Sequence, residues 1–80
     1  MLFLTIEEAF ESIKTIVNEK EGWFYLYLTQ EHELELWYRK GGETDLEFNE
    51  SSVTDAEFEK LAELVYENDL PVVLYKEFVL

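Results

Sequence analysis

Residues 23–38 have the sequence WFYLYLTQEHELELWY, in which two runs rich in aromatic and branched side chains flank a short polar segment. A strand places successive side chains on opposite faces of a sheet, so every second residue of each run faces the core. A three-residue loop puts the two core faces on the same side, and the stretch therefore predicts an antiparallel β-hairpin. The predicted core-facing residues are Phe24, Leu26, Leu28, Leu34, Leu36 and Tyr38.

The opposite face of this predicted hairpin combines large aromatic rings with carboxylates. Tyrosine and tryptophan carry polar atoms that tolerate water, and exposed aromatic residues are enriched where proteins bind one another. We expect a contact surface here, with coverage by residues 1–4 or by neighbouring side chains as the alternative. Homodimerisation through the same face is a second alternative, although it would bring two negatively charged molecules together. The residues assigned to this face are Trp23, Tyr25, Tyr27, Glu33, Glu35 and Trp37.

Two helices are predicted, one at each capping box in the sequence. In a capping box a threonine side chain accepts a backbone hydrogen bond and a glutamate three residues later reaches back. The first helix begins at Thr5 and stops before Gly22, and the second begins at Thr54 and is broken at residues 68–71. Apolar residues three and four apart give each helix one buried stripe. The predicted stripes are Ile6, Ala9, Phe10, Ile13, Ile16 and Val17 in the first helix and Phe58, Leu61, Ala62 and Val65 in the second.

Two further strands are predicted, one before and one after the second helix. A three-residue glycine loop at 40–42 favours a third strand in which Leu46 and Phe48 face the core. Residues 72–79 form the last predicted strand. The register of the third strand would add an acidic ladder to the outer face, beside Glu33 and Glu35 of the hairpin. Its members are Glu43, Asp45 and Glu47.

Together these elements predict an α+β fold with the element order αβββαβ. Because both helices carry one apolar stripe, we expect a four-stranded, mostly antiparallel sheet with the two helices packed on one face. A right-handed crossover through the second helix would make the last strand parallel to the third, with a place beside the first. A chain of 80 residues corresponds to one domain, 1–80.

The composition is acidic and lacks cysteine. Nineteen acids against six lysines and arginines give a formal net charge of −13, and a hydrophobic content of 48% indicates a folded chain. The negative charge repels nucleic acid and anionic lipid, so direct binding to nucleic acid or membranes is not expected. The sequence shows no signal-peptide pattern and no apolar run of about 20 residues, so we expect a cytoplasmic protein without disulfides.

Residues 43–69 contain ten acids and one base, Lys60, and carry −9 of the formal charge. Carboxylates at every fourth position form one column on a helix, where neighbouring like charges destabilise it by roughly 0.2–0.5 kcal/mol per pair. A solvated face that maintains solubility is one explanation. The lack of Glu–Lys pairs four residues apart in this column favours a face that binds a cationic partner. The column consists of Asp55, Glu59, Glu63 and Glu67.

No catalytic or metal-binding pattern is recognisable in the sequence. His32 is the single histidine and is expected in a solvated loop, and no serine lies in a nucleophile context. The spaced ligands and central glycine of a calcium-binding loop are also missing. We therefore expect a protein that is not an enzyme and uses no metal or cofactor.

In size, acidity, lack of cysteine and predicted α+β fold, the chain resembles the small acidic inhibitors of bacteriophages and mobile elements, which include anti-CRISPR proteins and anti-restriction DNA mimics. The resemblance implies an inhibitor, acting in a bacterial host cell, that presents carboxylates in place of phosphates. Its partner would be a Cas effector or another defence nuclease with a Lys/Arg-lined nucleic-acid site. The alternatives are an immunity protein or antitoxin that caps a basic toxin, and a homodimeric interaction module. The inhibitor and the immunity protein or antitoxin could each be a monomer or a homodimer.

Overall fold

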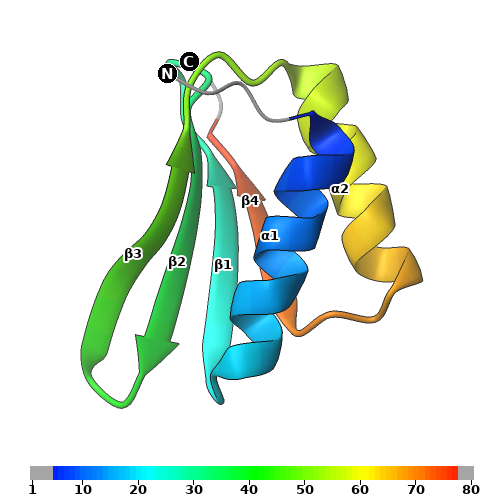
Figure 1. Ribbon diagram of the computed structural model, residues 1–80. Helices are drawn as coiled ribbons and strands as arrows, with labels where there is room; N and C mark the ends of the chain where they lie inside the picture. Colours follow the sequence, from blue (N-terminus) through cyan, green and yellow to red (C-terminus); the bar gives the residue numbers. More distant parts are fainter. Residues whose placement is uncertain (1–4, 78–80) are drawn as a thin grey trace.

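A computed structural model describes residues 5–77 of the chain and shows a four-stranded sheet with both helices on one face (Figure 1). This arrangement confirms the predicted α+β fold and its αβββαβ order. The elements in chain order are α1 (Ile6–Glu19), β1 (Trp23–Leu28), β2 (Leu34–Lys40), β3 (Glu43–Glu50), α2 (Asp55–Glu67) and β4 (Val72–Lys76).

The strands lie in the order β3-β2-β1-β4. β2 pairs antiparallel with both β1 and β3, whereas β4 pairs parallel with β1. The last strand is therefore beside the first and runs in the same direction as the third, as the crossover through α2 predicts. β4 ends at Lys76, and residues 78–79 of the predicted strand lie outside the described part of the chain.

Both helices begin at the predicted capping boxes. Thr5 Oγ1 accepts from the Glu8 amide at 3.1 Å, while the Glu8 carboxylate accepts from the Thr5 amide at 3.3 Å. At the second helix the corresponding distances between Thr54 and Glu57 are 3.1 and 2.9 Å. Each box satisfies two backbone donors that would otherwise lack a partner at a helix start.

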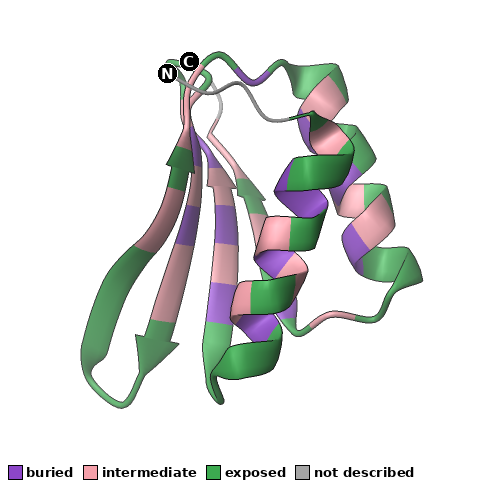
Figure 2. Ribbon diagram, in the orientation of Figure 1, coloured by how far each residue is buried: buried purple, intermediate pink, exposed green. Residues whose placement is uncertain are grey.

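The core lies between the two helices and the inner face of the sheet (Figure 2). The predicted inner residues of β1 and β2 are buried except Tyr38, which is half-buried, and Ile13, Phe24, Leu26, Leu36 and Leu61 are completely inaccessible to solvent. Three members of the predicted helix stripes are only half-buried. These are Ile6, Ile16 and Ala62.

The loop between β1 and β2 has three residues, 30–32, as predicted, because Thr29 and Glu33 still pair with each other. The Thr29 amide donates to the Glu33 carbonyl at 3.0 Å, and the His32 amide donates to the Thr29 carbonyl at 3.0 Å. His32 has a φ of 61°. A turn followed by a left-handed residue is a common three-residue hairpin connection, and here it sets Leu28 opposite Leu34.

The register predicted for the third strand is wrong. Lys40 pairs with Glu43, so the turn contains only Gly41 and Gly42, and Gly41 has a φ of 65°. A positive φ at the first of two turn residues fits a tight hairpin turn and is accessible to glycine at no steric cost. Because of this two-residue turn, the side chains at the start of β3 lie on the opposite faces of the sheet from those predicted.

A β-bulge then restores the core alternation further along β3. Leu36 pairs with Phe48, but Trp37 pairs with Leu46, so Glu47 is the extra residue. Because directly paired residues share a face, Phe48 stays on the inner face while Leu46 is displaced to the outer one, where it is 46% exposed. The prediction that Leu46 joins the core is therefore incorrect.

Candidate functional site

The four carboxylates of the predicted helix column all lie on the solvent side of α2. Their side of the helix is exposed, whereas Phe58, Leu61 and Val65 on the other side are buried in the core. Within residues 5–77, three of the four form no ion pair. These three, Glu59, Glu63 and Glu67, form a strip of carboxylates without an ion pair.

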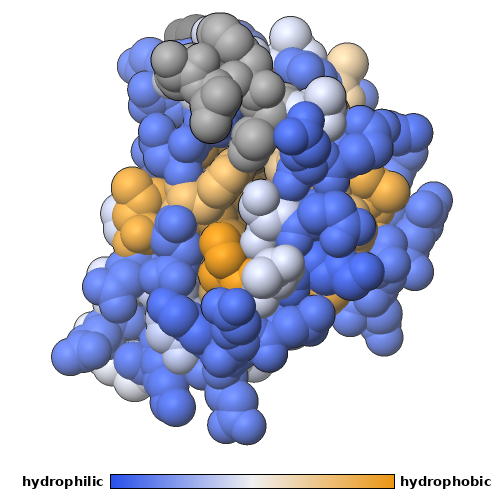
Figure 3. Space-filling model, viewed as in Figure 1, coloured by the Kyte–Doolittle hydropathy of each residue, from blue (hydrophilic) through white to orange (hydrophobic). Residues whose placement is uncertain are grey.

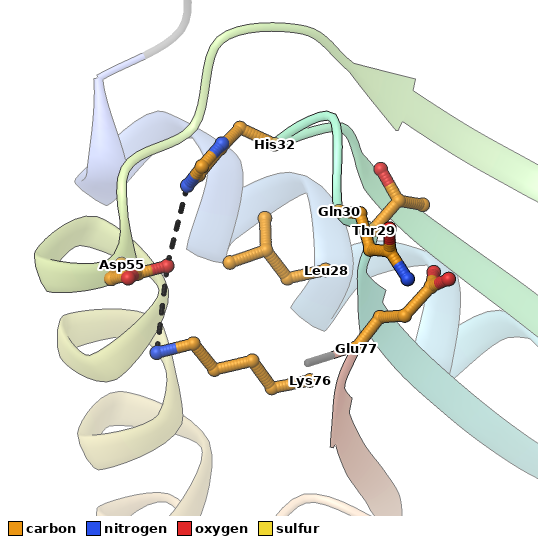
Figure 4. A pocket seen from close by; sticks show the side chains of 7 residues that line it. All are labelled: Leu28, Thr29, Gln30, His32, Asp55, Lys76 and Glu77. Atoms are coloured by element: carbon orange, nitrogen blue, oxygen red, sulfur yellow. Dashed lines mark ion pairs between the residues drawn. The ribbon is translucent and has the colours of Figure 1, made fainter. Parts of the chain in front are cut away.

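Asp55, the first member of the column, is different because it is paired. Its Oδ1 atom lies 3.5 Å from His32 Nε2 and 3.4 Å from Lys76 Nζ. The three side chains come from the hairpin loop, from β4 and from the first turn of α2, and they point toward one another (Figure 4). The exposed His32 of the sequence prediction therefore has a carboxylate partner.

This cluster borders a cavity of about 190 Å³. Leu28 lies on its inner wall, and the Lys76 ammonium points across it toward Asp55 (Figure 4). Asp55 is 57% exposed and links the start of α2 to the hairpin loop and to β4 through exposed ion pairs, which contribute little to stability. The cavity lining has no serine or cysteine that His32 could activate; the full lining is Leu28, Thr29, Gln30, His32, Asp55, Lys76 and Glu77.

The predicted outer ladder of Glu43, Asp45 and Glu47 does not exist as one outward row. Because of the two-residue turn, Asp45 lies opposite Tyr38 and Glu43 lies opposite Lys40, both on the inner side of the strand. Glu47, at the bulge, forms an ion pair with Lys20. These acids consequently lie at the edge of the helix-covered face.

Lys20 and Glu47 join the end of α1 to the middle of β3. Lys20 Nζ lies 2.5 Å from Glu47 Oε1 and 5.0 Å from the centre of the Tyr38 ring. The hydrogen bond to Glu47 raises the pKa of Lys20 above its ordinary value of 10.5. Glu47 is therefore paired within the chain, unlike the acids of the α2 strip.

The outer face of the sheet carries an apolar row that crosses all four strands. Leu46 pairs with Trp37, Trp37 with Tyr25, and Tyr25 with Val73, so these side chains lie in register from β3 to β4. Trp23 extends the apolar surface at the start of β1 and is 62% exposed. The predicted outward placement of Trp23, Tyr25 and Trp37 is thereby confirmed.

A second row on this face joins aromatic rings to carboxylates. Glu35 of β2, Tyr27 of β1 and Tyr75 of β4 are paired neighbours. The Tyr27 hydroxyl donates to Glu77 Oε2 at 2.9 Å, and the Trp37 indole donates to Glu35 Oε1 at 3.1 Å. The bond to Glu77, with burial and the nearby Glu77 and Glu35 charges, raises the pKa of Tyr27 above its ordinary value of 10.0. Both carboxylates are thus held in place by aromatic donors.

Glu33 is the residue immediately before β2 and is half-buried. Its amide donates to Thr29 Oγ1 at 3.1 Å and its carbonyl accepts from the Thr29 amide, so its backbone closes the hairpin loop. The backbone of Glu33 therefore stabilises the hairpin loop, at the loop end of the outer face.

Sequence reasoning missed four residues of the outer face: Leu46, Val73, Tyr75 and Glu77. The displacement of Leu46 depends on the bulge. For β4, alternation from the buried Val72 would have placed Val73, Tyr75 and Glu77 together on the other face. That signal was present in the sequence.

The surface on the helix side is mainly hydrophilic, with apolar side chains visible between α1 and β3 (Figure 3). A shallow groove lies there, lined by Glu11, Ser12, Thr15, Ile16 and Phe48. Among residues 5–77 there is no group of three or more histidine or acidic side chains placed to hold a metal ion. Over the same range, neither helix is long and apolar enough to cross a membrane.

Comparison of the chain with protein-family models, with curated proteins and with solved structures found no match.

Proposed function

We propose that the protein is a non-enzymatic inhibitor that binds the Lys/Arg-lined nucleic-acid site of a bacterial defence nuclease, in the manner of an anti-CRISPR protein. The observation that carries this proposal is the unpaired strip of Glu59, Glu63 and Glu67 on the exposed side of α2. A strip of carboxylates without an ion pair among the described residues favours a cationic partner.

The helix gives this strip a regular geometry. Carboxylates four residues apart repeat about every 6 Å along a helix axis. α2 is held by its capping box and by the packing of Phe58, Leu61 and Val65, so its backbone need not reorganise when a partner binds. Arginine and lysine side chains of a nucleic-acid channel would form charge-assisted hydrogen bonds with these carboxylates in place of phosphates.

The strip alone forms the primary contact of this proposal. Asp55 is engaged with His32 and Lys76, and Glu47 is engaged with Lys20. The strand acids Glu43 and Asp45 lie near the far edge of the sheet and would form secondary contacts only.

The test is a competition assay with purified Cas effectors, other defence nucleases and basic toxin nucleases. Fluorescence anisotropy of a labelled DNA duplex or guide RNA measures whether this protein displaces the nucleic acid. We expect displacement by the wild type and a loss of at least about tenfold in affinity for the triple variant Glu59→Gln/Glu63→Gln/Glu67→Gln.

The matched control is Glu7→Gln/Glu11→Gln/Glu19→Gln, which removes the same charge from exposed positions of α1. It should compete nearly as well as the wild type. Equal losses for the two triple variants would reduce the effect to net charge and contradict a specific role for the α2 strip. Displacement of nucleic acid from toxin nucleases alone would support the immunity class instead.

A further inference from the structure

The outer face of the sheet is a second surface, separate from α2. Both helices pack on the inner face, and within residues 5–77 no element covers the outer one (Figure 1). Exposed fractions reach 62% at Trp23, 51% at Tyr75 and 46% at Leu46. Uncovered patches of large apolar side chains on small proteins mark binding sites.

We propose that this face binds a basic segment of a protein partner, with a cationic side chain against the tyrosines of β1 and β4 and apolar side chains along the row from Leu46 to Val73. This surface faces away from α2, so it can bind a basic segment whether or not α2 binds a nuclease. If the protein is the inhibitor proposed above, the outer face gives it a second contact with its partner.

The cationic part of this proposal rests on three tyrosine rings, Tyr25 of the first row and Tyr27 and Tyr75 of the second. The rings of Tyr25 and Tyr75 stack with centroids 5.9 Å apart, and the Tyr27 ring lies 6.4 Å from that of Tyr75. Arginine side chains stack on such ring faces and are attracted by them. The three rings therefore offer a platform that suits a guanidinium group.

Two fixed carboxylates border this platform. Glu77 accepts from the Tyr27 hydroxyl and Glu35 accepts from the Trp37 indole, so both side chains are oriented before any partner binds. Among the described residues, neither carboxylate has a lysine or arginine within ion-pair distance. Aromatic faces beside uncompensated negative charge complement a cation, and the stacked ring and the carboxylate would act on it together.

A second copy of the chain fits this face less well. Each molecule carries a formal charge of −13, so face-to-face association must overcome strong repulsion. Four strands about 4.8 Å apart and between 5 and 8 residues long cover a flat footprint of roughly 400 Å². A stable protein–protein interface buries about 800 Å² per partner. A short segment matches the size of the face better than a second domain does.

The experiment maps a probe peptide onto the ¹⁵N-labelled protein by NMR at physiological salt. The probe is a short peptide composed of arginine and leucine, and its control replaces arginine with glutamine. We expect the arginine peptide to shift the amides of Tyr25, Tyr27 and Tyr75 and the indole signal of Trp37, and the glutamine peptide to bind at least about tenfold more weakly.

Variants separate this face from general acidity. Tyr75→Ala/Glu35→Gln should weaken peptide binding at least about tenfold. The matched control, Tyr66→Ala/Glu11→Gln, changes a 71% exposed tyrosine on α2 and an exposed acid on α1. It should leave the affinity within about twofold.

Three outcomes would overturn the proposal. Peptide-induced shifts confined to Glu59, Glu63 and Glu67 would restrict basic partners to α2, which leaves the inhibitor proposal standing. Contacts between the outer-face rings and residues 1–4 in the free protein would show that the chain covers its own sheet. A dimer in analytical ultracentrifugation that Tyr75→Ala dissociates would assign the face to a second copy.

Discussion

Gly22 lies directly against Tyr38, and this contact determines how the chain passes from α1 into the sheet. A Cβ atom added at Gly22 would meet Tyr38 Cε1 at 2.7 Å and the Arg39 carbonyl oxygen at 3.0 Å. Gly22 also has a φ of 149°, a backbone angle that residues with a side chain rarely adopt. The Tyr38 hydroxyl donates to the Glu21 carbonyl beside it, so ring and backbone fit closely together.

Gly22→Ala is therefore expected to destabilise the fold by about 1–3 kcal/mol, since both the backbone angle and the contact with Tyr38 are unfavourable for alanine. Gly42→Ala is the matched control, because a Cβ atom there meets nothing within 4 Å. Urea denaturation followed by circular dichroism measures both. Equal stability of the two variants would contradict the close packing at Gly22.

The β-bulge makes opposite predictions for two leucines on neighbouring strands. Leu46→Lys should change the free energy of unfolding by less than about 0.5 kcal/mol, because Leu46 lies on the outer face. Leu36→Ala should cost about 2–5 kcal/mol, because Leu36 is fully buried. A large loss of stability in Leu46→Lys would instead support a register in which this residue belongs to the core.

The ion pair of Lys20 with Glu47 predicts a pH-dependent difference between the wild type and Glu47→Gln. The bond raises the pKa of Lys20 in the folded protein, so its stabilising effect is fully present below pH 10.5 and is lost as the pH rises through the raised value. The wild type should melt at a higher temperature than Glu47→Gln at pH 8, and the difference should narrow at pH values above 10.5. A difference that stays constant across this range would mean that Glu47 acts through packing alone.

Reversal of two column charges separates stability from binding. Glu59→Lys/Glu63→Lys places lysines four residues from Asp55 and Glu67, so attraction replaces repulsion in two of the three neighbouring pairs, while the pair 59/63 stays repulsive. The fold should gain up to about 1 kcal/mol. The same double substitution should weaken binding to a basic partner. Added salt, which screens exposed charges, should weaken binding further. Thermal denaturation and the competition assay measure the two effects. Unchanged affinity would remove the column from the binding surface.

The helices, the first hairpin and the layer arrangement were predictable because their signals are local. Thr5 and Thr54 mark helix starts by hydrogen bonds within four residues, and the alternation of residues 23–38 fixes which side chains are buried. The exposed strip on α2 follows from the same helical periodicity. These features depend on neighbouring residues only and not on how distant segments meet.

The acidic ladder of β3 could not be predicted in the same way. The alternation of residues 43–48 is compatible with either face, and the choice between a two- and a three-residue turn reverses it. The bulge at Glu47 then reverses the alternation again, and Glu47 forms an ion pair with Lys20, the residue that follows α1. Tyr75 joins the outer face through pairing with Tyr27, which is distant in sequence.

The parallel pairing of β4 with β1 also sets an order of assembly. The hairpins of β1, β2 and β3 close over short loops, whereas Leu26 and Leu74 must meet across the whole of β2, β3 and α2. Contacts between segments so far apart in sequence form slowly during folding. On the ribosome, β4 is also the last described strand to emerge. The tyrosine platform needs both β1 and β4, so it exists only once this pairing between distant segments has formed.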